Sequence, residues 1–493
     1  MAEAQKHLSE LGLKARQGRD PLLAGVTLDS RAAGPGMLFA ALPGSTRHGA
    51  DFIAAALDQG AAAILTDAMG AVIAAEALGR SGAALVVADD PREALAYAAA
   101  LWFGAQPQTM VAVTGTNGKT SVATFARQIW TALGHEAINV GTTGIEGAWS
   151  APSSHTTPDP VTLHRMLAQA AAAGVTHAAM EASSHGLDQR RLDGVRLAAA
   201  GFTNLTQDHL DYHHTMEAYL AAKAGLFTRL LPEDAVAVVN LDGAHGSEIA
   251  ETALQRGLRL LTVGKGPGAD LQIAGSRPDA TGQEVRLIWQ GQAVQTRLNL
   301  IGAFQAENVA LAAGLAIATG DDPQAVLSAL PGLGGVRGRM QLAATRANGA
   351  SVFVDYAHTP DAIETALRAL RPHVMGRILI AFGAGGDRDT TKRPLMGAAA
   401  RAHADVLFVT DDNPRSEDPA AIRAAILAAC PEANEVGDRA EAILRAVDAL
   451  QPGDALLIAG KGHETGQTIK GMTYPFDDVE QASIAVAALD GVI

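Results

Sequence analysis

Short runs of β-branched and other apolar residues alternate along the chain with longer alanine-rich stretches whose apolar positions recur every three or four residues. The short runs predict buried strands, and the longer stretches predict helices. Because strands and helices alternate, the pattern favours parallel sheets covered by helices and therefore an α/β fold. One segment departs from it: VRLIWQGQAVQTRLNL (285–300) predicts an antiparallel hairpin.

A chain of 493 residues is too long for one ordinary hydrophobic core. Its pattern divides at the linker GAQPQT and again at the glycine-rich segment PGLGGVRGR. We therefore predict three α/β domains over residues 1–107, 108–336 and 337–493. The central domain is expected to be a P-loop ATPase-like parallel sheet with an antiparallel addition. The C-terminal domain, with its strand-then-loop units such as SVFVDYAH and ALLIAGKGHE, is expected to be Rossmann-like.

The composition narrows the class of protein. A net charge of −14 argues against general binding to nucleic acid or acidic membranes, so an anionic ligand must be held by local donors. The apolar runs are too short to span a membrane, and the first twenty residues lack the pattern of a secretory signal. Cys430 is the single cysteine, which excludes an intrachain disulfide framework, and we expect it buried on a helix before Pro431. We expect a cytoplasmic protein, and a monomer.

The strongest motif is a phosphate loop that follows the apolar run 110–113 and opens a helix. Small residues let backbone N–H groups close on phosphates at a helix N-terminus, Lys119 can reach the terminal phosphates, and the Thr120 hydroxyl can ligate Mg²⁺. The residues expected to contact ATP here are Gly115, Thr116, Asn117, Gly118, Lys119, Thr120 and Ser121. Val113 stands where the general pattern has glycine, and the alternative interpretation is a glycine turn capped by threonine.

Two further segments offer metal ligands. Glu181 ends the apolar run VTHAAME, and a carboxylate there suits Mg²⁺. His209 lies in the histidine-rich segment TNLTQDHLDYHH and is a softer second candidate. That segment could also be solvated polar surface, and its histidine spacing is weak support for zinc.

Lys223 lies near the middle of the apolar arc of a helix predicted over 216–231. If its side chain is buried, its pKa falls, and the neutral amine can add CO₂ to form a carbamate that ligates metal. The alternative is a snorkelling lysine whose stem covers apolar surface. On the helical pattern alone, snorkelling is the better account.

These segments together resemble the ATP-dependent Mur ligases, which build the peptidoglycan stem peptide. The resemblance rests on TGTNGKTS, MEASSHGLDQRR, TNLTQDHLDYH and YLAAKAGLF, and on the C-terminal segments VDYAHTPD, GAGGDRDTTKRPLMG, TDDNPRSEDP and AGKGHET. It extends over three domains and fits the branch that adds the third residue. It implies a carbamylated Lys223 that binds Mg²⁺ with Thr120, Glu181 and His209. Gln305 departs from the asparagine common in the family.

The resemblance also implies the substrate contacts, residue by residue. For ATP, beyond the phosphate loop, they are Asn308, Arg339, Asp355 and His358. For the uridine nucleotide bound by residues 1–107 they are Leu28, Ser30, Ser45, Thr46 and Arg47. For the muramoyl peptide they are His155, Thr156, Thr157, Ser183, Gln189 and Arg191. For diaminopimelate they are Arg388, Asp412, Asn413, Pro414, Arg415, Gly460 and Glu464.

The choice of amino acid has a physical argument of its own. Meso-diaminopimelate differs from lysine by a second carboxylate, and the planar fork of Arg415 in DDNPR matches a carboxylate. Glu464 could accept the distal ammonium. Taken alone, Arg415 in an acidic turn would more often be a surface ion pair, and it is the resemblance together with the companion Arg388 that reverses this.

The expected reaction is therefore ATP-dependent amide formation between UDP-N-acetylmuramoyl-L-alanyl-D-glutamate and meso-diaminopimelate, through an acyl phosphate. A lysine-adding ligase, a folylpoly-γ-glutamate synthetase and a nucleotide-dependent switch or transport ATPase are the alternatives.

Overall fold

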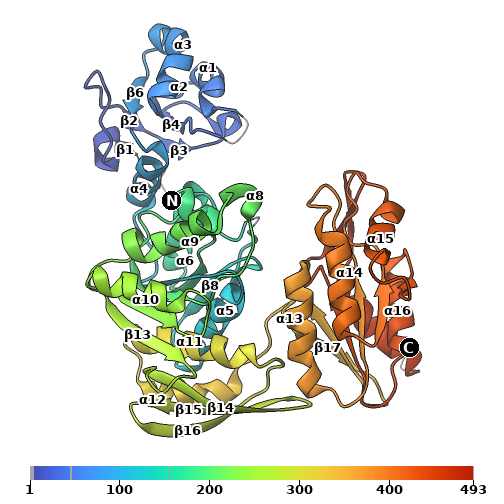
Figure 1. The fold of residues 1–493 in the computed structure, drawn as a ribbon. Helices are drawn as coiled ribbons and strands as arrows, with labels where there is room; N and C mark the ends of the chain where they lie inside the picture. Colours follow the sequence, from blue (N-terminus) through green and yellow to red (C-terminus); the bar gives the residue numbers. More distant parts are fainter. Residues whose placement is uncertain (1–4, 45–46, 154, 492–493) are drawn as a thin grey trace. The chain divides into compact units, whose positions relative to one another are not determined.

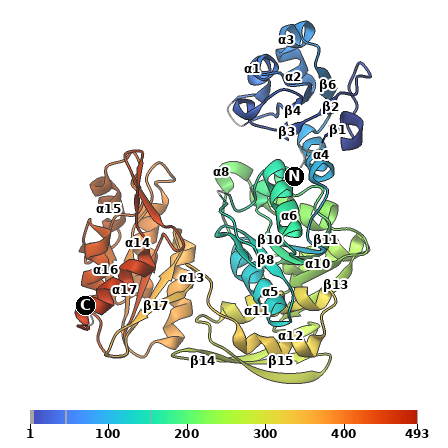
Figure 2. The ribbon, with the colours of Figure 1, turned by 180° about the vertical axis from the view of Figure 1, so that it is seen from behind.

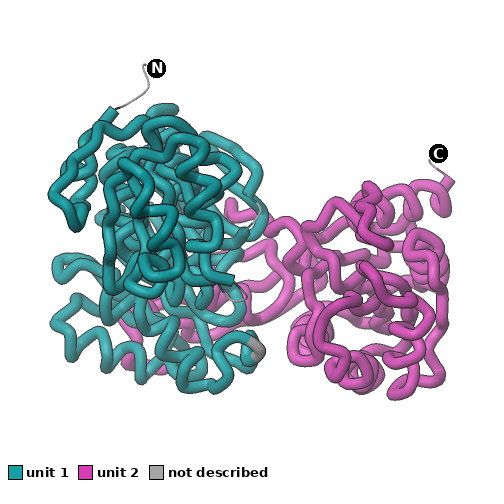
Figure 3. Tube along the Cα trace, turned by 90° about the horizontal axis from the view of Figure 1, so that it is seen from above, with its two compact units in different colours: residues 1–264, 311–326 teal, residues 265–310, 327–493 magenta. Residues whose placement is uncertain are grey.

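The computed structural model describes residues 5–44, 47–153 and 155–491. The chain forms two compact units, residues 1–264 with 311–326, and residues 265–310 with 327–493 (Figure 3). Within the described residues no helix combines the length and the apolar character needed to cross a membrane.

The N-terminal part of the first unit is a four-stranded parallel sheet of order β3-β4-β5-β6. Leu38 and Leu65 point into one core and Phe39 and Ile64 into another, as alternation along a strand requires. The strands are β3 Gly25–Thr27, β4 Met37–Ala40, β5 Ala63–Thr66 and β6 Ala84–Val87, beside a small antiparallel pair, β1 Lys6–His7 and β2 Leu22–Leu23. The helices are α1 Ile53–Asp58, α2 Ala68–Ile73, α3 Ala75–Arg80 and α4 Pro91–Phe103, with the 3₁₀ turns η1 Leu8–Leu11, η2 Ser30–Ala32 and η3 Gly49–Phe52.

The larger sheet of the first unit has β7 near its middle, between β11 and β10. Every pair among its strands is parallel except β8 with β9. In order across the sheet the strands are β13 Arg259–Gly264, β12 Val236–Asn240, β11 Leu197–Phe202, β7 Thr109–Thr114, β10 His177–Glu181, β8 Ala137–Gly141 and β9 Gly144–Gly147. The carboxyl ends of β7, β10 and β11 therefore meet at one edge, where ligands of α/β sheets bind.

Helices cover both faces of this sheet. One face packs on α6, α9 and α10 (Figure 1), and α5 and α11 lie on the other (Figure 2). The helices are α5 Lys119–Ala132, α6 Pro160–Ala172, α7 Ser184–Asp188, α8 Leu210–His213, α9 Met216–Gly225, α10 Gly246–Gln255, α11 Phe304–Ala318 and α12 Pro323–Ala329, with the π-helical turn η4 Leu226–Leu230.

The second unit begins with an antiparallel meander, β14 Leu271–Asp279, β15 Gly282–Trp289 and β16 Gln292–Leu298. The pairing of β15 with β16 confirms the hairpin predicted from the alternating pattern. His373 holds this meander's turn region, since its ring contacts the carbonyl oxygen of Asp279 at 2.5 Å and accepts from the backbone N–H of Gly302 at 3.0 Å.

The rest of the second unit is a six-stranded sheet of order β17-β18-β22-β19-β20-β21, in which only β17 is antiparallel to its neighbour. The strands are β17 Gln341–Thr345, β18 Ser351–Asp355, β19 Ile378–Phe382, β20 Val406–Val409, β21 Asn434–Glu435 and β22 Ala455–Ala459, followed by the hairpin β23 Gly466–Ile469 and β24 Met472–Pro475. The helices are α13 Pro360–Leu370, α14 Lys392–His403, α15 Pro419–Leu427, α16 Arg439–Asp448 and α17 Asp478–Leu489, with the 3₁₀ turns η5 Leu330–Gly332 and η6 Arg371–His373.

The two faces of this sheet carry separate cores. Helices α13, α14 and α15 pack on one face, and α16 and α17 pack on the other (Figures 1 and 2). The strand-then-helix order confirms the predicted Rossmann-like alternation. The three domain boundaries predicted from the sequence stay a prediction, because the division by contacts keeps residues 1–107 with the first large sheet.

One local prediction was wrong. Cys430 is buried, as expected, but it lies beyond the end of α15 at Leu427 and not on a helix. Pro431 accounts for this, because the residue before a proline is disfavoured in the helical conformation.

Candidate active site

The phosphate loop connects β7 to the N-terminus of α5, as the motif predicts. Gly115 has φ +144°, and a Cβ atom there would lie 1.8 Å from the Thr203 hydroxyl, so only glycine fits. Gly118, with φ 89°, caps α5. Lys119 folds back over the loop, and its Nζ donates to the carbonyl oxygens of Gly115 at 3.0 Å and Thr116 at 2.7 Å. The glycine-turn alternative does not account for this lysine, and the expected contacts with ATP stay a prediction.

The end of β11 braces the loop. Asn204 accepts from the N–H of Thr116 at its backbone oxygen (2.8 Å) and from the N–H of Asn117 at its side-chain oxygen (3.1 Å). The Thr203 hydroxyl donates to the carbonyl oxygen of Asn117 at 2.6 Å. These contacts hold the loop backbone in a fixed shape, which an anion cradle requires.

Glu181 ends β10, directly beside the phosphate loop, because β10 pairs with β7 in parallel and Glu181 lies opposite Val113. Its carboxylate accepts from the Thr120 hydroxyl at 3.0 Å and from the N–H of Thr142 at 2.7 Å. Gly141 makes room for it, since a Cβ there would lie 2.1 Å from the carboxylate. The structure thus brings together two of the predicted Mg²⁺ ligands, both hard oxygen donors.

Lys223 lies on α9 and is 1% exposed, so the snorkelling interpretation is wrong. Its Nζ donates to the carbonyl oxygen of Gly115 at 2.6 Å and lies 4.5 Å from the centre of the Tyr219 ring. Burial lowers the pKa of Lys223 well below its ordinary value, and the nearby charge of Lys119 lowers it further. After Gly225 the helix widens into η4, a π-helical turn of the kind frequent at functional sites.

His209 has a left-handed backbone, with φ 53°, at the start of α8. Partial burial lowers the pKa of its imidazole, which favours the neutral ring that can ligate metal. Its ring centre is 6.2 Å from that of Tyr219, the ring that Lys223 also approaches. Within residues 5–44, 47–153 and 155–491 there is no group of three or more histidine, cysteine, aspartate or glutamate side chains arranged to hold a metal ion.

The predicted muramoyl-peptide residues cluster beside Glu181. The Thr157 hydroxyl donates to the backbone oxygen of Glu181 at 2.9 Å and accepts from the N–H of Ser183 at 3.1 Å. Arg191 donates to the carbonyl oxygen of Thr157 at 2.7 Å and to the side-chain oxygen of Gln189, also at 2.7 Å. Of the neighbouring segment, the Thr156 hydroxyl contacts that of Thr142 at 3.0 Å, and the backbone N–H of His155 donates to the Ser153 hydroxyl at 3.4 Å.

The predicted uridine-nucleotide residues follow two neighbouring parallel strands, β3 and β4. Leu28 and Ser30 come after β3, and Arg47 lies in the turn after β4, where it is exposed. Because these strands are parallel, both segments lie at the same edge of the sheet. Ser45 and Thr46 lie outside the described residues.

The predicted nucleotide residues Asp355, Arg339 and His358 of the second unit contact neighbouring backbone and ring groups of that unit. Asp355 ends β18 and accepts from the N–H of Met340 at 2.7 Å and of Ala357 at 2.8 Å, and burial raises the pKa of its carboxyl. The Arg339 guanidinium lies 4.6 Å from the centre of the Tyr356 ring. The His358 ring contacts the carbonyl oxygen of Tyr356 at 2.9 Å.

Gln305, the departure from the family pattern, has a defined partner. Its side-chain oxygen accepts from the Asn308 amide at 3.1 Å, and both side chains are buried. The longer amide therefore fills the space next to the residue expected to contact the nucleotide.

The predicted diaminopimelate residues lie at the carboxyl ends of β20 and β22, separated in the sheet by β19. Asn413 donates to Glu464 at 2.8 Å and to Asp412 at 3.0 Å. Gly460 leaves room for Asp412, since a Cβ there would lie 2.5 Å from the Asp412 carboxylate. Arg415, with φ 51°, donates to the carbonyl oxygen of Gly386 at 2.6 Å. Pro414 is buried, and Arg388 is exposed on the loop that follows β19.

Three supporting residues were missed by sequence reasoning. Tyr219 neighbours both Lys223 and His209, Lys461 is buried beside Asn413 and Glu464, and Arg439 is also buried. Lys461 directly follows the apolar run ALLIAG, and a lysine at such a position was a usable signal.

Three family models match the chain. They are the Mur ligase family catalytic domain over residues 23–102, the Mur ligase middle domain over 113–316 and the Mur ligase glutamate ligase domain over 338–462. Among curated proteins, the UDP-N-acetylmuramoyl-L-alanyl-D-glutamate--2,6-diaminopimelate ligase of Caulobacter vibrioides is 51% identical and covers 96% of each chain. The protein of the same name from Bradyrhizobium diazoefficiens is 50% identical over 94% of this chain and 95% of its own.

Solved structures agree with this match. A UDP-N-acetylmuramoyl-L-alanyl-D-glutamate--2,6-diaminopimelate ligase is 35% identical, covers 99% of each chain and superposes with a TM-score of 0.72. A folylpolyglutamate synthase of Mycobacterium tuberculosis, at 20% identity, shares the fold over 78% of this chain and 91% of its own, with a TM-score of 0.59. The arrangement of the sheets and the phosphate loop match those of the three-domain α/β ligases. The chain belongs to the Mur ligase family.

Proposed function

We propose that the chain is an ATP-dependent ligase that joins meso-diaminopimelate to UDP-N-acetylmuramoyl-L-alanyl-D-glutamate in peptidoglycan biosynthesis, with release of ADP and phosphate. We further propose that it acts in the cytoplasm as a monomer. The observation that carries the proposal is the match, over nearly the whole length of both chains, to relatives that bear this activity in their names. The exposed Arg388 and the half-buried Arg415 at the edge of the C-terminal sheet support the choice of a dicarboxylic amino acid.

The chemistry follows from what the parts can supply. A carboxylate is a poor electrophile, so the substrate's glutamate γ-carboxylate first attacks the γ-phosphate of ATP, giving an acyl phosphate and ADP. The phosphate loop binds the nucleotide through its backbone N–H groups, and Lys119 offsets charge on the transferring phosphoryl group. Arg339 is proposed to contribute a second cation. The amine of diaminopimelate then attacks the acyl carbon, and phosphate leaves.

The residues beside the phosphate loop fit Mg²⁺. Thr120 and Glu181 present hard oxygen atoms to each other at 3.0 Å, and a carbamate on Lys223 would add a further carboxylate-like group. We propose that these three residues and His209 hold magnesium, which when bound screens the negative charges of ATP and of the attacking carboxylate. The buried, lowered-pKa amine of Lys223 supports carbamylation, because only the neutral amine adds CO₂.

The cluster beside Glu181 supports binding of the muramoyl peptide. Thr157, Ser183, Gln189 and Arg191 are joined by hydrogen bonds to each other and, through Thr157, to the residue proposed to hold metal. A substrate carboxylate bound there would lie near the metal site, so positioning supplies much of the catalysis.

The deciding experiment measures phosphate release from ATP and Mg²⁺ with the muramoyl dipeptide, adding meso-diaminopimelate or L-lysine in parallel. We expect turnover with diaminopimelate and little with lysine. Arg415→Met is expected to lower kcat/KM for diaminopimelate by about tenfold or more, since it removes a charge-assisted hydrogen bond, and to leave lysine turnover unchanged. Turnover mainly with lysine would overturn the amino-acid assignment. Hydrolysis indifferent to both would favour a nucleotide switch.

A further inference from the structure

The C-terminal domain contains a lysine that the proposed amino-acid site does not account for. Lys461 follows β22, and its side chain is 0% exposed. Its Nζ donates to the carbonyl oxygen of Gly466 at 2.5 Å and to the side-chain oxygen of Asn413 at 3.3 Å, and it lies 3.5 Å from the Glu464 carboxylate. A buried ammonium is unfavourable unless it is paired and hydrogen-bonded, and these three partners supply that pairing.

Lys461 fixes the orientation of the Asn413 amide. The amide oxygen faces two donors, the Lys461 ammonium and the N–H of Thr468 at 2.9 Å. The amide nitrogen faces two carboxylates, Asp412 at 3.0 Å and Glu464 at 2.8 Å. A flipped amide would set its NH₂ against two donors and its oxygen against two acceptors, so this orientation is strongly favoured.

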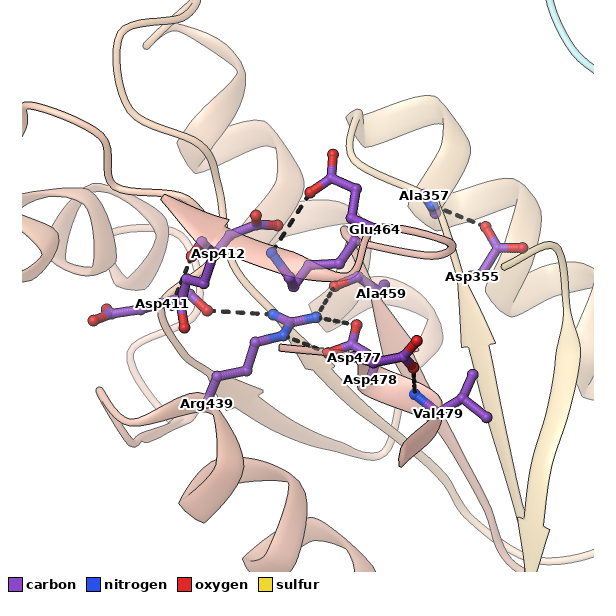
Figure 4. Close-up of polar contacts among 12 residues, drawn as sticks. Asp355, Ala357, Asp411, Asp412, Arg439, Ala459, Glu464, Asp477, Asp478 and Val479 are labelled. Carbon is purple, nitrogen blue, oxygen red and sulfur yellow. Dashed lines mark hydrogen bonds and ion pairs between the residues drawn. The ribbon is translucent and has the colours of Figure 1, made fainter. Parts of the chain in front are cut away.

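Glu464 is held from one side and open on the other. Lys461 and Asn413 approach its carboxylate from the protein interior, while its side chain stays 35% exposed. In Figure 4 the Glu464 carboxylate points away from the buried Arg439 and Asp478, while Asp412 is itself buried. A ligand ammonium can therefore reach a carboxylate whose position is already set, which reduces the ordering cost of binding.

Arg439 is a second buried cation nearby, and it bonds to backbone carbonyl oxygens as well as to Asp478. Arg439 donates to the carbonyl oxygens of Ala459 at 3.0 Å and Asp411 at 3.3 Å and pairs with Asp478 at 2.7 Å (Figure 4). It therefore holds the ends of β22 and β20 together. Lys461 differs because two of its partners are side chains of the proposed binding site.

We propose that Lys461 is a positioning residue for the acceptor amino acid, which holds the Asn413 amide and the Glu464 carboxylate in the orientation that receives the ligand's ammonium group. The inference rests on the proposed function and deepens it. Lys461 itself is enclosed and acts through its two partners. Its loss is expected to weaken binding of diaminopimelate while leaving the binding of ATP and the muramoyl dipeptide as it is.

The test uses Lys461→Met in the full-length enzyme, because methionine is an unbranched side chain of similar length that carries no charge. Val447→Ala, a cavity in the core on α16, is the matched control that lowers stability without touching these groups. For each variant the melting temperature, kcat and the KM of all three substrates are measured. We expect Lys461→Met to raise the KM for diaminopimelate by about tenfold or more, the loss of a hydrogen bond to a charged group, and Val447→Ala to leave it unchanged.

A double-mutant cycle with Glu464→Gln separates positioning from stability. If Lys461 acts through Glu464, its substitution raises this KM less in the Glu464→Gln background than in the wild type. Lys461→Gln, which keeps a donor for Gly466, is the second variant in case Lys461→Met does not fold.

The inference is overturned if the KM for diaminopimelate stays at its wild-type value, or if all three KM values and kcat change together as a general loss of structure would require. The proposed function fails in a different way, since the wild-type enzyme would then show no turnover that depends on diaminopimelate.

Discussion

The Nζ atom of Lys223 lies 2.6 Å from the carbonyl oxygen of Gly115, the first glycine of the phosphate loop. A lysine on α9 is thereby joined to the loop that follows β7, a strand far away in the sequence. The contact places the buried amine beside the loop that is proposed to bind the phosphates of the nucleotide. Lys223 is therefore close enough to the proposed nucleotide site to act in it, whereas a lysine on the surface would not be.

Replacing Lys223 with methionine is expected to lower turnover by at least about tenfold, the range seen when groups that support a metal ligand set are lost. Methionine fills the same apolar space, so the melting temperature should change little. In the wild type, bicarbonate labelled with ¹³C should give a carbamate NMR signal, and the variant should lack it. Full turnover by Lys223→Met would contradict the role.

Glu181→Gln removes the charge of a carboxylate that contacts Thr120 while keeping its shape. Because a neutral amide is a weaker ligand for a hard cation, the Mg²⁺ concentration needed for half-maximal activity should rise by about tenfold or more. Titration of phosphate release with MgCl₂ measures this. Thr142→Ser, which keeps the backbone donor to Glu181, is the control. An unchanged Mg²⁺ requirement would place the metal elsewhere.

Arg439 and Asp478 form an ion pair in which both side chains are 0% exposed. Arg439→Met leaves the Asp478 carboxylate buried without its partner, so we expect the free energy of unfolding of the C-terminal domain to fall by about 3–5 kcal/mol. Urea denaturation measures the change.

Asp478→Asn combined with Arg439→Met should recover part of this loss, because the unpaired buried charge is then gone. Equal destabilisation by the single and double variants would show that backbone contacts of Arg439, and not the charge, dominate.

His177 gives the first unit a defined sensitivity to acid. Burial, and after it the neighbouring His135, lowers the pKa of His177 from 6.5 to about 4. Between these values the unfolded chain binds a proton that the folded chain does not, so stability falls as the pH drops from about 6.5 to about 4. Below that window no further loss comes from this group.

The difference in melting temperature between the wild type and His177→Gln isolates this contribution. The wild type should lose more stability than the variant between pH 7 and pH 5. A difference that is independent of pH would exclude His177 as the source.

Local features of the sequence were enough to predict the elements and the ends of strands where chemistry lies. The phosphate loop, Glu181 at the end of β10 and the loops after β20 and β22 follow from short apolar runs that stop at polar residues. Local signals also have limits, as Cys430 shows, because a short helix can end a few residues before a proline.

Only the tertiary structure decided which side chains meet. The apolar arc around Lys223 is compatible with both snorkelling and burial, and the choice depends on what covers the helix, which is the phosphate loop. Likewise the contact of Lys461 with Asn413 joins the ends of two strands that are far apart in the chain. The sequence determined where each strand ends in polar residues, since that pattern is local. The pairing of those groups was settled by the parallel register of the sheets, which brings distant strand ends to one edge.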